Sequence, residues 1–181
     1  MTERIRLVEV FTPEVPWSVQ DLEPGEIAES VHTASGIVDG VHTLGRVTGQ
    51  FFVPDGASRN GRFYPRSLWE RVLKSEDTKH RLNDRLMFGT IGHDDQAVSE
   101  EQLRRGDVSH VITRLWIEDG KGLGEALILN TEAGRNLNTY LRAGCRLKTS
   151  SRASGQYRDG VTHDGLPVVD EDAYLFETFD F

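Results

Sequence analysis

Cysteine is almost absent from this chain of 181 residues, which contains only Cys145. A single thiol excludes an internal disulfide framework and a zinc site built from clustered cysteines. We therefore expect a hydrophobic core to hold the fold, and we expect a soluble protein made in a reducing cytoplasm.

Positive charge is also scarce. The chain has 21 Lys and Arg against 29 Asp and Glu, a net charge of −8. Because nucleic acids and anionic membranes are bound through basic charge, we expect neither as a partner. The sequence contains no run of about 18 apolar residues, and its N-terminal apolar stretch is too short for a signal peptide. Neither a membrane span nor secretion is indicated.

What is present is typical of a folded globular protein. Apolar residues make up 37% of the chain and charged residues 28%, which excludes fibrous and strongly disordered classes. At roughly 150 residues per domain, the length predicts a single domain over residues 1–181. Residues 12–45 contain several Pro and Gly residues and are expected to be rich in loops.

The predicted elements are mostly strands. Alternating β-branched and aromatic residues predict strands at 5–11, 46–53, 108–118 and 124–129, and further strands after Arg146, broken at 158–160 and 163–165. Helical spacing of apolar residues predicts helices at 66–73, after Pro65, and between Thr131 and Gly144. Because these elements do not alternate strictly, we expect an α+β fold: a mainly antiparallel β-barrel or sheet with packed helices.

Three polar segments contain candidate functional residues: 58–65, 89–95 and 146–155. By composition alone, each is compatible with ordinary surface turns, and we expect a turn at 151–155. In the second, His93 precedes two aspartates, a pattern that also fits an oxygen-rich metal site. A zinc site is not expected, because no second His stands at ligand spacing. The order of His, Ser and a late Asp permits a Ser-His-acid arrangement.

Four segments, taken in order, resemble the prohead (procapsid maturation) serine proteases of tailed myophages. They are Asn60-Gly61-Arg62-Phe63-Tyr64-Pro65, Gly89 to His93, Arg142-Ala143-Gly144 followed by Ser150-Ser151-Arg152, and Phe179-Asp180-Phe181. The resemblance extends from about residue 46 to 181. It implies a fold distantly similar to that of the herpesvirus assemblins.

The resemblance also implies catalytic roles. It assigns the nucleophile to Ser150, the general base to His93 and the third member to Asp180, with His110 as the alternative third member. Asp94 and Asp95 are weaker alternatives, because a carboxylate next to the base in sequence rarely reaches its Nδ1.

Donors to the oxyanion are expected from Arg152 and from the backbone that starts at Ser151, although Arg152 would equally fit a surface salt bridge. Two residues depart from the family pattern. Asp94 replaces a common Pro after the catalytic His, and its negative charge is expected to raise the pKa of the base. Ala153 replaces a Gly and puts the predicted turn in question.

Members of this family cleave after Glu, with an aliphatic residue two positions earlier, which implies a cationic pocket. Arg62, Arg146 and Lys148 are the candidate substrate-binding residues, and Arg59 and Arg152 are further cations nearby. The segment Ile27-Ala28-Glu29 fits this cleavage pattern and suggests self-cleavage.

The expected function is therefore that of a serine endopeptidase that cuts phage scaffold and major capsid proteins, and possibly itself, after Glu. It would act without a cofactor or metal, in the host cytoplasm inside the assembling procapsid. Two alternatives stay open: a non-catalytic capsid or tail assembly module on a related barrel, and a metal-assisted hydrolase that uses His93, Asp94 and Asp95. Whether copies of the chain form a homo-oligomer is also open.

Overall fold

A computed structural model describes residues 4–11, 13, 17–21, 32–33, 36–37, 43–92 and 98–181. The predicted base at His93, the neighbouring aspartates and the predicted cleavage site at Glu29 lie outside these residues.

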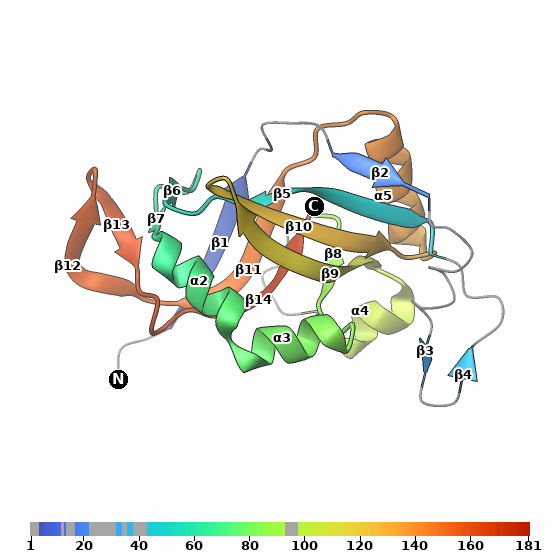
Figure 1. The fold of residues 1–181 in the computed structure, drawn as a ribbon, viewed down its shortest axis with the longest axis horizontal. Helices are drawn as coiled ribbons and strands as arrows, with labels where there is room; N and C mark the ends of the chain where they lie inside the picture. Colours follow the sequence, from blue (N-terminus) through green and yellow to red (C-terminus); the bar gives the residue numbers. More distant parts are fainter. Residues whose placement is uncertain are drawn as a thin grey trace.

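The larger of the two main sheets has five antiparallel strands and runs across the middle of the molecule (Figure 1). Its order is β2 (Ser18–Gln20), β5 (Gly45–Phe52), β10 (Lys121–Ile128), β9 (Val108–Glu118) and β8 (Phe88–Thr90). Its neighbouring strands β9 and β10 form a hairpin across Asp119 and Gly120.

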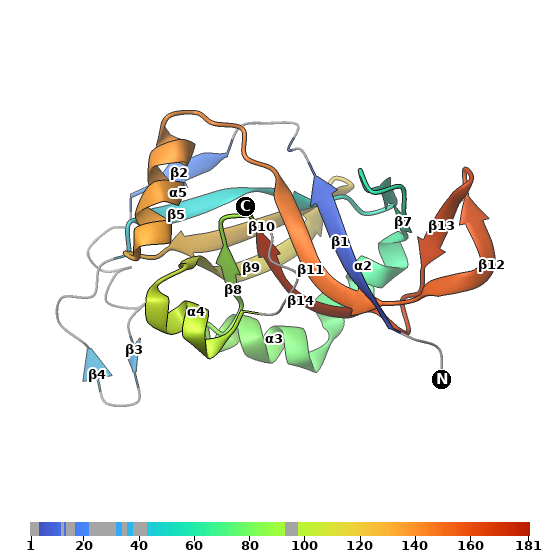
Figure 2. The same cartoon turned by 180° about the vertical axis from the view of Figure 1, so that it is seen from behind.

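The second main sheet is three-stranded and crosses the first, as the view from behind shows (Figure 2). It consists of β1 (Ile5–Phe11), β11 (Thr149–Gly155) and β14 (Leu175–Asp180), all antiparallel, with β11 in the centre. Strand β14 is an edge strand of this sheet and contacts β8 of the larger sheet.

Two smaller sheets complete the described strands. One joins β12 (Tyr157–His163), β13 (Leu166–Val169), β7 (Phe63–Tyr64) and β6 (Gly56–Ala57), and the other pairs β3 (His32–Thr33) with β4 (Gly36–Ile37). The described strands thus form separate open sheets. The predicted α+β fold with mainly antiparallel sheets is confirmed, and of the two forms expected it is the sheet rather than the closed barrel.

The helices lie on two sides of the sheets (Figure 1). They are α2 (Arg66–Lys74), α3 (Glu76–Asn83), α4 (Glu100–Arg105) and α5 (Glu132–Arg142). Helix α5 packs on β9 and β10, and α3 contacts β9. No helix in the described part of the chain is long and apolar enough to cross a membrane.

Most of the predicted elements are confirmed within a few residues. They are the strands predicted at 5–11, 46–53, 108–118 and 124–129, and the two helices that correspond to α2 and α5. Helices α3 and α4 and strand β8 were not predicted. Two expected interruptions were wrong. Residues 158–160 lie inside β12, where Gly160 has φ 66° and the pairing register shifts, and residues 151–155 belong to β11 rather than to a turn.

An aromatic core joins the two main sheets. The ring of Phe52 on β5 stacks on that of Phe179 on β14, with centroids 5.7 Å apart, and Trp69 of α2 packs against both. Phe181 continues this core against Phe51. Side chains alternate between the two faces of a strand. Because Phe179 and Phe181 pack in the core, the side chain of Asp180 between them points to the opposite face of the sheet.

Candidate active site

Ser150 and Asp180 lie opposite each other on neighbouring strands. They are register partners of the antiparallel pair β11–β14, an arrangement that places Cβ atoms roughly 5 Å apart. Both are nearly inaccessible, with relative exposures of 7% and 1%. The predicted nucleophile and the predicted third member are therefore brought together, although 29 residues separate them in the sequence.

The Ser150 hydroxyl differs from those of its two neighbours. Thr149 Oγ1 donates to the carbonyl of Phe51 at 3.0 Å, and Ser151 Oγ lies 3.5 Å from the hydroxyl of Tyr174. Ser150 Oγ is buried yet makes no hydrogen bond to any described residue. Burying a hydroxyl without a hydrogen-bond partner costs roughly 1–3 kcal/mol of folding free energy. A serine that bears this cost beside a carboxylate is typical of a hydroxyl that is available for reaction.

The Asp180 carboxylate is held by a buried cation and by β8. Arg152, on the same face of β11 as Ser150, donates to Asp180 Oδ2 from Nε at 3.0 Å and from Nη2 at 2.8 Å. Thr90 donates to Oδ1 from its backbone N–H at 2.9 Å. The surface salt bridge considered for Arg152 is in fact a buried ion pair, in which the exposures of the two side chains are 0% and 1%.

The backbone at the end of β14 is also joined to the residue that precedes His93. Gly92 donates its N–H to the carbonyl of Phe181 at 2.7 Å, and Phe181 donates to the carbonyl of Thr90 at 3.1 Å. Gly92, one residue before the predicted base, therefore lies beside the end of the strand that carries Asp180.

His110 lies on β9 with no exposure to solvent. Its Nε2 is 3.0 Å from the carbonyl of Phe179 and its Nδ1 is 2.9 Å from Ser109 Oγ. Since a carbonyl can only accept, Nε2 carries the hydrogen and Nδ1 accepts from Ser109. Burial lowers the pKa of His110 to about 4, against smaller opposing effects of Asp180 and the Phe179 carbonyl, so the ring is neutral near pH 7.

A model of the prohead core protein serine protease family matches residues 16–178. The chain belongs to this family. The protein is thus a serine protease of the phage prohead, as the four motifs predicted, and not a non-catalytic module. Its fold matches that of the bacteriophage T4 capsid assembly protease gp21, with a TM-score of 0.72, 20% sequence identity and coverage of 99% of both chains. No curated protein sequence matches.

The predicted oxyanion donors of this protease lie on β11, the central strand of the three-stranded sheet. Ser151 and Arg152 are fully buried, and each has a register partner on both β1 and β14. The guanidinium of Arg152 is directed to Asp180. Ala153, which replaces the family's glycine, lies at the register shift between β11 and β14.

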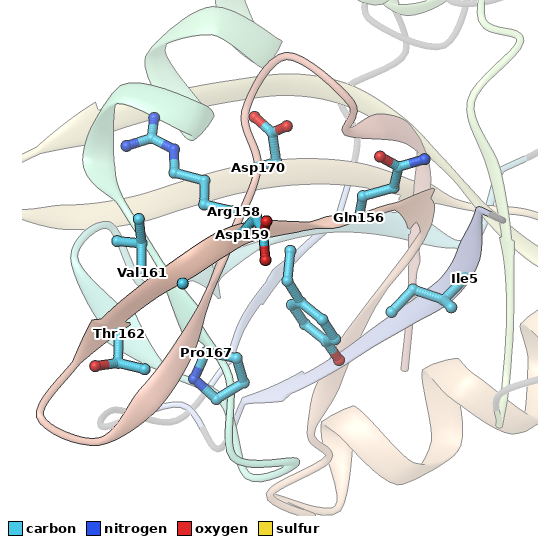
Figure 3. A pocket seen from close by; sticks show the side chains of 10 residues that line it. Ile5, Gln156, Arg158, Asp159, Val161, Thr162, Pro167 and Asp170 are labelled. Carbon is cyan, nitrogen blue, oxygen red and sulfur yellow. The ribbon is translucent and has the colours of Figure 1, made fainter. Parts of the chain in front are cut away.

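The three predicted substrate-binding cations do not lie together. Arg146 and Lys148 are exposed and precede β11, with Lys148 two residues before Ser150. Arg62 lies beyond the other end of β11, with its guanidinium 5.9 Å from the ring centre of Tyr157. Tyr157 lines a groove of about 820 Å³ between the start of β1 and the β12–β13 hairpin (Figure 3), which contains neither Ser150 nor Asp180.

The metal hypothesis rests on His93, Asp94 and Asp95, which lie outside the described residues. Within the described residues, no group of three or more His, Cys, Asp or Glu side chains is arranged to hold a metal ion. Thr90 was missed by the sequence analysis. It stands in the segment 89–95, but a threonine in a short strand gives no sign of a partner 90 residues away.

Proposed function

We propose that this protease hydrolyses peptide bonds with Ser150 as nucleophile, His93 as general base and Asp180 as the group that orients the base. The observation that carries the proposal is the buried Ser150 hydroxyl, without a partner among the described residues, opposite the Asp180 carboxylate. The position of Gly92 beside Phe181 supports it, because the next residue in the chain is His93.

In this mechanism, Ser150 Oγ attacks the carbonyl carbon of the peptide bond while the neutral imidazole of His93 takes the hydroxyl proton. The resulting imidazolium passes that proton to the amine as the C–N bond breaks, which leaves an ester on Ser150. A water molecule then attacks the ester, again with His93 as base, and releases the acid. Asp180 stabilises the imidazolium in both halves of the reaction.

Asp180 suits the third role better than His110. Both ring nitrogens of His110 already have partners, the Phe179 carbonyl and the Ser109 hydroxyl, and its low pKa keeps it neutral. Asp180 offers a negative charge on the same side of the sheet as Ser150. Of the two predicted oxyanion donors, the Arg152 side chain serves Asp180, and Ser151 lies in the central strand between β1 and β14.

The proposed substrates are phage scaffold and major capsid proteins, cut after Glu inside the assembling procapsid. The structurally similar T4 protein is a capsid assembly protease, which supports this assignment. Lys148 is the proposed contact for the substrate glutamate, because it lies two residues from Ser150 and is exposed, whereas Arg62 lies beyond the far end of β11. Self-cleavage after Glu29 is part of the same proposal.

The decisive experiment replaces the nucleophile. The parent protein should cut a peptide that contains Ile-Ala-Glu and leave its Ile-Ala-Gln counterpart intact, and it should release a fragment that ends at Glu29. Ser150→Ala should lower the cleavage rate by roughly 10⁴-fold or more, because triad members act as a unit.

Ser154→Ala is the matched control, since Ser154 lies on the same face of β11. Cleavage by Ser150→Ala at the parental rate would refute the nucleophile. Equal cleavage of both peptides would refute the specificity for Glu while leaving the nucleophile intact.

A further inference from the structure

The hairpin of β6 and β7 contains the first of the four sequence motifs, and the proposed mechanism gives that motif no role. Ser58 donates its backbone N–H to the carbonyl of Arg62 at 2.8 Å, and Gly61, with φ 70°, donates to the carbonyl of Ser58 at 3.1 Å. These two bonds and the left-handed glycine define a three-residue hairpin loop with a bulge at Gly61. The pairing continues that of Ala57 with Phe63, so the side chains of Ser58 and Arg62 lie opposite each other on one face of the hairpin.

These two side chains each contain a buried polar atom without a hydrogen bond to any described residue. Ser58 is 6% exposed and its Oγ has no such partner, and the same is true of Arg62 Nη1. The Arg62 guanidinium lies over the ring of Tyr157, but this contact gives the N–H groups no hydrogen-bond acceptor. Because burying a donor without an acceptor is costly, two such donors on one face of a short hairpin indicate an acceptor that the described residues do not supply.

The groove that Tyr157 lines suits a peptide (Figure 3). Its lining includes Ile5, Tyr157 and Val161, which are 36%, 37% and 44% exposed and are three of the seven exposed large apolar side chains among the described residues. Such a group of apolar side chains marks an interaction surface. The strands that line the groove, β1 and β12, are edge strands of their sheets, and an edge strand can pair with an extended peptide.

The charges around this groove determine where an acidic residue of the peptide would bind. Asp159 and Asp170 line the groove (Figure 3) and repel a carboxylate. Arg158 is already paired with Glu171 at 2.9 Å. Arg62 forms no ion pair with a described residue, and its guanidinium lies at the Tyr157 ring. A carboxylate is therefore favoured at the Tyr157 side of the groove, where Arg62 and Ser58 can both donate to it.

Strand β1 leads from this groove to the active site. Ile5 lines the groove, and Val10, five residues later, is the register partner of Ser150. At roughly 3.3 Å per residue, an extended polypeptide spans that interval with about five residues. A substrate that is cut at Ser150 can therefore also reach the groove, with residues that lie about five or more positions from the cleaved bond.

We propose that Ser58 and Arg62 bind a carboxylate of the protein substrate at a distance from the cleaved bond, while an apolar neighbour of that acidic residue packs against Tyr157 in the groove. This inference rests on the proposed function, because it needs a substrate that is cut at Ser150. It assigns Arg62, a candidate for the cleaved glutamate in the sequence analysis, to a second carboxylate and leaves Lys148 as the contact for the first.

The test compares peptides that share Ile-Ala-Glu and differ in a second segment. A Gly-Ser linker of about six residues, long enough for the interval along β1, joins Ile-Ala-Glu to Leu-Asp-Leu-Asp or to the uncharged Leu-Asn-Leu-Asn. A second pair of peptides has the segment on the other side of the cleaved bond. For one of the two pairs, the parent should have a KM on the order of 10-fold lower for the acidic peptide, with the same kcat, because each hydrogen bond to a charged group contributes about tenfold to binding.

The variants show whether this preference comes from the hairpin. In Arg62→Gln the ratio of the two KM values should fall to about one, and Ser58→Ala should lower it a few-fold. Arg59→Gln is the matched control and should keep the parental ratio, because Arg59 is an exposed cation of the same loop. If Arg62→Gln does not fold, as judged by its Tm, Ser58→Ala decides the test, since it removes only a hydroxyl.

Equal KM values for the acidic and the uncharged peptides in the parent, or the parental ratio in Arg62→Gln, would overturn the inference. A parental oligomer that Arg62→Gln dissociates, as seen by sedimentation, would assign this surface to a second copy of the chain and would also overturn it. Fluorescence anisotropy of the labelled acidic peptide with Ser150→Ala measures the same preference without cleavage. A parent that cuts none of the peptides would refute the proposed function, whereas equal binding of both peptides to Ser150→Ala would refute the carboxylate site.

Discussion

Arg152 and Asp180 show what a buried charge requires of its partner. Their side chains are 0% and 1% exposed, and two hydrogen bonds join them. Arg152→Met removes the cation and leaves a carboxylate enclosed in protein, which typically costs about 3–5 kcal/mol. Urea unfolding should reveal this loss in the free energy of unfolding. The double variant Arg152→Met/Asp180→Asn should recover part of the lost free energy of unfolding. Equal stability of the single and the double variant would contradict the prediction.

At this scale, residue types were easier to predict than partners. The adjacent serines and the late aspartate stood in recognisable motifs, and the structure brings Ser150 and Asp180 together. Arg152 was expected to be either an oxyanion donor or part of a surface salt bridge, because nothing in a sequence indicates that its partner lies 28 residues away and is buried with it. Thr90 went unrecognised for the same reason.

At the scale of elements, apolar periodicity predicted α2 and α5 but failed for the two polar helices. Helix α3, Glu-Asp-Thr-Lys-His-Arg-Leu-Asn, has a single apolar residue, and α4 also has one. The ends of α4 carry recognisable capping residues: Ser99 and Gln102 form a capping box, and Gly106 ends the helix. Helix α3 matters for the site, because Arg81 donates to the carbonyls of Phe176 and Glu177 and so covers the edge of β14.

Helix α5 lies so close to the larger sheet that a methyl group does not fit between them. A Cβ added at Gly134 would lie 1.8 Å from the carbonyl oxygen of Leu129 and 2.9 Å from that of Ser109. Gly134→Ala should therefore lower the free energy of unfolding by about 1–3 kcal/mol, although alanine is the better helix former by about 1 kcal/mol.

Asn136→Ala is the control for this prediction, since Asn136 lies on the exposed face of the same helix. It should leave stability unchanged or raise it slightly. A Gly134→Ala variant that melts at or above the parental temperature would show that the helix can move away from the sheet.

At the scale of the whole molecule, the sequence predicted the class of fold but not the pairing of its sheets. Strand β11 lies between β1, more than 130 residues earlier, and β14, at the other end of the chain. Alternation of apolar and polar side chains identifies a strand, but it does not predict which other strands pair with it. The juxtaposition of Ser150 with Asp180 is a product of this pairing, and it became visible only in three dimensions.

His110 links the two main sheets, because it lies on β9 and its Nε2 donates to the carbonyl of Phe179 on β14. Burial lowers its pKa from 6.5 to about 4, so between these values the unfolded chain binds a proton that the folded protein does not. The stability that the neutral ring contributes is therefore complete above about pH 6.5 and is lost as the pH falls toward 4, by about 3 kcal/mol at most. Urea unfolding at pH 7.5, 6 and 5 measures this loss.

The comparison that isolates His110 is between variants, because carboxylates elsewhere also titrate as the pH falls. His110→Gln should unfold more easily at pH 7.5 but lose less stability than the parent between pH 7.5 and 5. His80→Gln is the control for the loss of an imidazole at the surface, since His80 is an exposed residue of α3. The same slope in the parent and His110→Gln would mean that His110 is protonated in the folded protein. A charged ring would still donate from Nε2 to the Phe179 carbonyl, but it could no longer accept from Ser109 through Nδ1, and the Ser109 hydroxyl would donate to the carbonyl of Gly89, 3.3 Å away, instead.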